Sequence, residues 1–105
     1  MAQDGHGLHV FRSSADNSAV VSGEGWLDET TCGMLQSAID EALESGIERL
    51  RVDLLELQGI DDAGLRCLAR TSERCRLSGI GLQIEASEPV RELLTAGGLT
   101  EQFTT

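Results

Sequence analysis

One stretch of this chain decides its fold: LRVDLLELQGIDDAGL, which spans residues 50–65. Leu50, Val52 and Leu54 alternate with polar residues, and this period of two predicts a half-buried β-strand. Residues 55–60 are expected to form a connecting loop. Two acids, Asp61 and Asp62, then open a segment whose apolar residues recur at spacings of three and four, which is typical of an amphipathic helix. The stretch therefore predicts a strand, a loop and a helix in direct succession.

Further elements are predicted on either side of this stretch from apolar spacing and turn residues. The expected strands cover residues 8–11, 19–22, 50–54 and 82–85, and the expected helices cover 30–45, 61–77 and the segment from 87 to the glycines at 97 and 98. Residues 13–17 are turn-like, and Gly23 and Gly25 interrupt the second strand. Asp28 or Thr30 is expected to cap the first helix. The inward face of the second helix is predicted to consist of Leu65, Leu68, Ala69 and Cys75.

These elements follow one another in the order β-β-α-β-α-β-α, which is typical of an α/β protein. Strands separated by helices imply right-handed crossovers and a parallel sheet. The first two strands are close enough to form an antiparallel hairpin. We therefore expect one α/β domain over residues 1–105, with a mixed, mostly parallel sheet of four to five strands and helices packed against it. Residues 1–7 are polar, hold two glycines and are expected to be flexible.

The composition excludes several classes of function. The chain has 105 residues and a formal net charge of −10, and all eight of its cationic side chains are arginines. Such a chain offers no extended cationic surface to nucleic acid or to an anionic membrane. Without lysine it cannot hold a phosphate-binding loop of the Gly-Lys-(Ser/Thr) type. An acidic chain is steered toward basic partners, which favours protein binding. The lack of a leader-like or long apolar segment predicts a cytoplasmic location.

The cysteines and histidines show no pattern that would hold a metal ion. Cys32, Cys67 and Cys75 lie within apolar helical patterns, so we expect buried, reduced thiols. His6 and His9 have no evident third ligand and are expected at the surface. The lone tryptophan is expected to pack in the core, with anchoring of a partner as the alternative.

The stretch over residues 50–65 resembles the signature of STAS domains, the family of anti-sigma-factor antagonists, in which an apolar strand precedes Asp-Ser-(Ser/Thr/Ala)-Gly-Leu. Asp61, Gly64 and Leu65 match this pattern. The resemblance extends over about residues 8–103, and it includes Gly25-Trp26-Leu27-Asp28 and the leucine at 99 after two glycines. It implies a STAS fold and a non-enzymatic protein-interaction function in bacterial regulation.

In the resembled family, the Ser after the Asp is phosphorylated by the anti-sigma-factor kinase, and here that position is Asp62. A carboxylate would supply a permanent negative charge where relatives carry a reversible one. The chain could thus be held in a non-binding state, bind a partner that accepts the carboxylate, or have left sigma-factor control; we favour partner binding. Independently of the resemblance, two acids at a helix start are also good capping groups. The predicted partner-binding loop comprises Asp28, Asp61, Asp62, Ala63, Gly64, Leu65 and Arg66.

The resemblance implies as partner an anti-sigma factor with a kinase-like fold. Two alternatives remain open: an accessory subunit of a lipid-transport ATPase, and a nucleotide-sensing domain. No cofactor is expected apart from that nucleotide, and no nucleophile–base or metal arrangement indicates an enzyme. Arg66, Arg70 and Arg74 recur at every fourth residue. They are expected either to form a solvated face paired locally with Glu73, or to form a cationic stripe that contacts an acidic partner or a phosphate.

Overall fold

A computed structural model describes residues 7–98 of the chain. It contains, in chain order, β1 (Leu8–Ala15), β2 (Ser18–Leu27), α1 (Cys32–Glu44), β3 (Arg49–Leu54), β4 (Leu57–Ile60), α2 (Asp62–Ser78), β5 (Gly81–Ala86) and α3 (Glu88–Ala96). The predicted single α/β domain with a mixed sheet is confirmed. Within residues 7–98, no helix is long and apolar enough to span a membrane.

The sheet is mostly parallel and is ordered β1-β2-β3-β5. β1 and β2 form the expected antiparallel hairpin, while β3 pairs parallel with β2, and β5 pairs parallel with β3. β4 continues along the same side of β2 as β3 does, so that β3 pairs with residues 18–22 and β4 with residues 25–27. β2 is therefore long enough to pair with both strands of the stretch over residues 50–65, β3 and β4.

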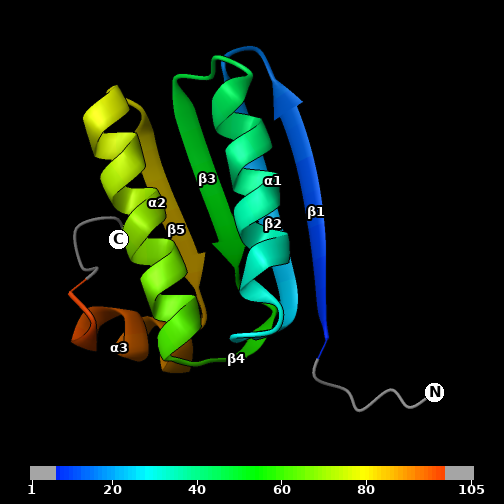
Figure 1. Cartoon of the computed structure of the whole chain (residues 1–105), viewed down its shortest axis with the longest axis vertical. Coiled ribbons are helices and arrows are strands. Elements are labelled where there is room, and N and C mark those ends of the chain that lie inside the picture. Colours follow the sequence, from blue (N-terminus) through cyan, green and yellow to red (C-terminus); the bar gives the residue numbers. More distant parts are fainter. Residues whose placement is uncertain (1–6, 99–105) are drawn as a thin grey trace.

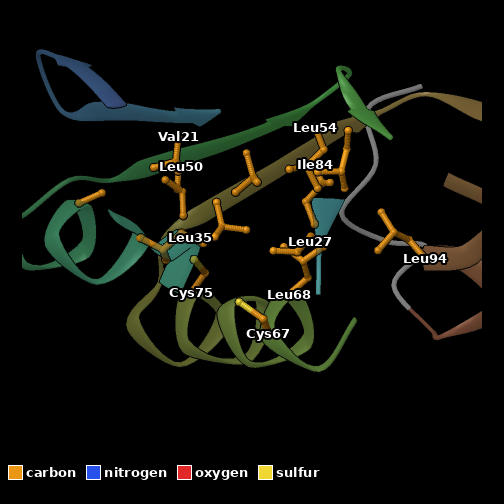
Figure 2. Packing of buried hydrophobic residues seen from close by; sticks show 14 of the residues in the cluster. Val21, Leu27, Leu35, Leu50, Leu54, Cys67, Leu68, Cys75, Ile84 and Leu94 are labelled. Atoms are coloured by element: carbon orange, nitrogen blue, oxygen red, sulfur yellow. The ribbon is translucent and has the colours of Figure 1, made fainter. Parts of the chain in front are cut away.

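The hydrophobic core lies between the sheet and two helices, α1 and α2, which lie side by side over one face of the sheet (Figure 1). Val21, Val52 and Ile84 occupy paired positions on three adjacent strands, and all three are fully buried. Figure 2 shows Val21 and Ile84 on the side of the sheet that faces Leu35, Cys67 and other side chains of the two helices. α3 packs instead at one end of the domain, against β4 and β5.

All four predicted strands are shorter than those observed, the first two by several residues, and one strand is missing from the prediction. β1 runs on to Ala15, and β2 continues through Gly23 and Gly25 to Leu27, because the two strands pair over the whole length of the hairpin. The expected turn over residues 13–17 is wrong for its first half. The expected loop over residues 55–60 is also wrong, since Leu57–Ile60 forms β4. In both cases pairing with a neighbouring strand outweighs weak local propensity.

The helices agree with the prediction more closely than the strands do. α2 begins after Asp61 and ends at Gly79, whose left-handed backbone (φ 71°) is favourable for glycine. On its inward face Leu68 and Cys75 are buried and Leu65 is half-buried, but Ala69 is exposed, which contradicts the prediction for that residue. Cys67 and Thr71 are buried there in addition. The leucine at 99, which the family resemblance includes, lies outside the described residues.

The predicted cap of α1 is wrong. The N-cap position is Thr31, without a side-chain capping bond, because Asp28 and Thr30 belong to a turn that precedes the helix. The expectation for the cysteines holds for Cys67 and Cys75, which are buried as free thiols, whereas Cys32 is only half-buried.

Candidate functional site

Two loops meet at the carboxyl ends of β2 and β4, at the same end of the domain where α2 begins (Figure 1). The first loop follows β2 and contains Asp28 and Glu29, and the second consists of Asp61 between β4 and α2. The backbone N–H of Asp61 donates to the carbonyl oxygen of Leu27 at 3.1 Å. This bond extends the parallel β2–β4 ladder by one residue and fixes the start of α2 against the end of β2.

Asp61 uses both of its carboxylate oxygens within this end of the domain. Oδ1 accepts the backbone N–H of Gly64 at 3.0 Å, which makes Asp61 the N-cap of α2. Oδ2 accepts the backbone N–H of Glu29 at 3.2 Å, across to the loop after β2. One side chain therefore satisfies a free donor of the helix terminus and also joins the two loops.

Asp62 has a different position and no such partners. It is the first residue of α2, its side chain is exposed, and it makes no hydrogen bond or ion pair with any residue in the range 7–98. Its carboxylate lies beside the positive end of the helix macrodipole, which favours a negative charge there. The two neighbouring acids are thus divided in role: Asp61 holds the loop, and Asp62 presents a charge to solvent.

The three residues that follow differ in exposure. Gly64 is buried, and a Cβ placed on it would lie 2.7 Å from both the Leu27 carbonyl oxygen and Ile60 Cγ1. Glycine at this position therefore lets the first turn of α2 approach the end of β2. Ala63 and Leu65 are half-buried, and Leu65 faces the end of α3 near Gly97.

Asp28 is half-buried, and its carboxylate is hydrogen-bonded within its own loop. Its Oδ1 accepts the Thr30 hydroxyl at 2.8 Å and the backbone N–H groups of Thr30 and Thr31 at 3.0 and 3.1 Å. The hydrogen bond from the Thr30 side chain is the main reason that the pKa of Asp28 is lowered. Thr31 anchors the same turn, because its buried hydroxyl donates to the Trp26 carbonyl at 2.7 Å and accepts the Asp28 N–H at 2.9 Å.

The arginines on α2 do not pair in the predicted way. Arg74 forms its ion pair with Asp40 on α1, while Glu73 pairs with Arg76, so the expected pairing of the stripe with Glu73 is wrong. Arg66 and Arg70 are exposed and make no hydrogen bond or ion pair with any residue in the range 7–98.

Other candidate residues have mainly structural positions. Trp26 is half-buried, and its indole ring covers Gly59 so closely that a Cβ there would lie 2.1 Å from a ring carbon. Cys67 donates to Gln36 Oε1 at 3.2 Å, and burial raises the pKa of its thiol to about 11. His9 is exposed on β1, and His6 lies outside the described residues.

Two residues of the site, Glu29 and Thr31, were not predicted from the sequence. Glu29 contributes a backbone N–H, which carries no signature in the sequence. Thr31 could have been found from the Asp-x-x-Thr spacing of residues 28–31, in which each side chain can bond the other's backbone.

A family model described as "Mlab, STAS domain" matches residues 10–104, and the chain therefore belongs to this family of STAS domains. Solved structures of the same fold include an anti-sigma factor antagonist from Mycobacterium paratuberculosis, with a TM-score of 0.79, 26% identity and coverage of 91% of this chain and 82% of that one. The phosphorylated form of SpoIIAA, the Bacillus cell fate determinant, matches with a TM-score of 0.74, 13% identity and coverage of 91% and 89%. The comparison with curated protein sequences finds no match.

Proposed function

We propose that this chain is a non-enzymatic, cytoplasmic interaction domain of bacterial regulation that acts as an anti-sigma factor antagonist. Its partner is an anti-sigma factor with a kinase-like fold. The binding face is the end of the domain at which the loop after β2 meets the first turn of α2. The fold shared with the Mycobacterium paratuberculosis antagonist supports this assignment.

The observation that carries the proposal is the position of Asp62. It stands where the family resemblance places a phosphorylatable Ser, at the exposed start of α2, and it has no bonding partner within residues 7–98. A carboxylate brings one fixed charge to this point, whereas a phosphate would bring about −1.5 to −2. Asp62 cannot be esterified by a Ser kinase, so the partner has to accept its charge permanently.

The supporting structure around Asp62 makes it suitable as a contact residue. The Asp61 carboxylate accepts hydrogen bonds from the backbone of Gly64 and Glu29. The Asp28 carboxylate accepts hydrogen bonds from Thr30 and Thr31. These two acids hold the surface in place, and Asp62 is left to contact a partner. Interfaces gain affinity when the contact surface is already ordered before binding.

The test is a binding titration of purified anti-sigma factors from the same organism against the wild type, Asp62→Ser and Asp62→Asn. The matched control is Glu44→Gln, which also neutralises one exposed acid but lies at the far end of α1. We expect the Asp62 variants to change affinity by about tenfold, as for a charge at an interface, and Glu44→Gln to leave it unchanged.

Incubation of Asp62→Ser with ATP and the same anti-sigma factor should add one phosphate at the introduced hydroxyl, visible by mass spectrometry. If no anti-sigma factor binds either the wild type or Asp62→Ser, the proposed function is wrong. If all four proteins bind with equal affinity, Asp62 is not at the interface.

A further inference from the structure

Arg66 and Arg70 are two of the eight arginines of this chain, and they lie on adjacent turns of α2. Arg12, Arg51, Arg74 and Arg76 each form an ion pair with an acid of the same chain. Arg66, Arg70 and Arg49 at the start of β3 are exposed and form none within residues 7–98, although the chain carries 18 acidic residues, and of these three only Arg66 and Arg70 lie one turn apart on the same helix. Intramolecular partners are therefore abundant in the sequence, yet these two guanidinium groups are left for solvent.

The two arginines lie in line with Asp62. Residues four apart in a helix lie on one face, one turn above the other, so Asp62, Arg66 and Arg70 occupy three successive turns of α2. Arg74, one turn further, is already held by Asp40 of α1. We call Asp62, Arg66 and Arg70 the charged stripe of α2. It reads negative, positive, positive from the start of the helix.

We infer that the charged stripe of α2 docks a protein segment whose acidic side chains lie opposite Arg66 and Arg70. This inference rests on the proposed function, because it extends the binding face from Asp62 along α2 and names the chemistry of the partner. Arginine is suited to this role, since its planar guanidinium forms two parallel hydrogen bonds with one carboxylate. An acidic pair spaced one helical turn apart would meet both arginines at once.

The surroundings of the stripe favour a protein segment over a nucleotide. Nucleotides bind in concave sites that bury most of the ligand, and the stripe lies on the convex outer face of a helix. A hollow of about 490 Å³ in the described part is lined by residues of β2, β3 and β5, among them Val20, Arg51 and Gln83, and none of its lining residues belongs to α2.

The stripe is also a local positive region on a protein whose overall charge is negative. At −10, the protein repels acidic partners at long range. An acidic segment can therefore bind only where local cations outweigh that repulsion, and two arginines on adjacent turns, unpaired within residues 7–98, provide such a place.

The test titrates the isotopically labelled protein with a synthetic helical peptide that carries glutamates at positions i and i+4 of one face. The control peptide carries glutamines there. The readout is the NMR signals of the arginine Nε–H groups and of the α2 backbone. We expect the glutamate peptide to shift the signals of Arg66 and Arg70, and the glutamine peptide to bind at least about tenfold more weakly.

The decisive variant is Arg66→Glu/Arg70→Glu, and its control is Arg49→Glu/Arg76→Glu, which changes the net charge equally but lies at the other end of the strands and of α2. We expect the first double variant to lose binding of the glutamate peptide by about tenfold or more and the second to keep it. Arg66→Lys/Arg70→Lys should fall between, because it keeps the charge but loses the paired hydrogen bonds.

Equal binding by both double variants, or peptide-induced shifts that map away from α2, would overturn the inference. The same holds if ATP shifts the Arg66 and Arg70 signals while the glutamate peptide does not. Failure of the proposed function is a separate result, because it would show as wild-type protein that binds the peptide but no anti-sigma factor.

Discussion

The carboxylate of Asp61 reaches 32 residues back along the chain and accepts the backbone N–H of Glu29 at 3.2 Å, while its other oxygen caps α2 at Gly64. The Asp61 side chain thus caps α2 and also holds the loop that follows β2. The end of the domain that carries Asp62 is therefore ordered by its neighbour, and the two adjacent acids can be separated by experiment.

We expect Asp61→Ala to lower the free energy of unfolding by at least about 0.5–2 kcal/mol, the usual cost of losing an N-cap, because it also removes the bond to the loop after β2. Asp61→Asn keeps one carbonyl oxygen but replaces the other with an amide NH₂ group, which cannot accept the Glu29 N–H. It should therefore be intermediate. Asp62→Asn should cost less than about 1 kcal/mol, because it loses only the interaction with the helix dipole. Urea denaturation measures all three, and equal losses for Asp61→Ala and Asp62→Asn would contradict this division of roles.

Gly64→Ala should destabilise the protein by about 1–3 kcal/mol, because the added methyl group would press on the carbonyl of Leu27 and on Ile60. Gly33→Ala is the matched control, since it also lies in the first turn of a helix but has open space around it. The control should be neutral or stabilising by up to about 1 kcal/mol, owing to the better helix propensity of alanine. Thermal unfolding of both variants gives the comparison, and a harmless Gly64→Ala would show that α2 does not approach β2 this closely.

Gly59→Ala should displace the Trp26 indole, because the new methyl group would occupy the space of the ring. Trp26 is the lone tryptophan, so its fluorescence reports on this position alone. We expect a red shift of the emission as the ring becomes more exposed to water. Gly81→Ala lies on another strand with only ordinary contacts and should leave the spectrum unchanged.

The stability of the protein should fall at alkaline pH in part because of Cys67. Burial raises the pKa of this thiol to about 11, compared with about 8.5 for a thiol in an unfolded chain. Because the folded state keeps the proton longer, the contribution is present below about pH 8.5 and is lost as pH rises toward 11, with a slope of at most about 1.4 kcal/mol per pH unit. Cys67→Ala should flatten this decline, measured by urea denaturation at a series of pH values. Cys32→Ala should leave most of the effect in place, because burial is the largest cause of the raised pKa of Cys67 and the interaction with Cys32 is a smaller one.

The sequence predicted the elements whose residues carry their own periodicity. Leu50, Val52 and Leu54 alternate in β3, and all three are buried as expected. The start of α2 could be placed at Asp61 because an acid before an amphipathic segment is a local capping signal. The exposed position of Asp62 follows from the same local pattern.

β4 could not be predicted in the same way. Its four residues include Gly59, and it exists as a strand because residues 25–27 of β2 are available beside it. The pairing of Arg74 with Asp40 likewise depends on how α1 and α2 lie together, so local spacing pointed to Glu73 instead. Ala69 fits the helical spacing of the core face, yet it is exposed, whereas Cys67 and Thr71 of the same helix are buried.

By itself, the sequence determined the α/β class, the order of most elements and the placing of two adjacent acids at the mouth of a helix, because short-range periodicity and capping preferences encode these features. Only the tertiary structure decided that Asp61 is bound to the loop of β2, that Asp62 and two arginines remain without partners within residues 7–98, and that glycine is needed at position 64. These features depend on contacts such as those of Asp61 with Glu29 and of Gly64 with Leu27, which join segments more than thirty residues apart, or on the absence of such contacts, and local propensity cannot specify either.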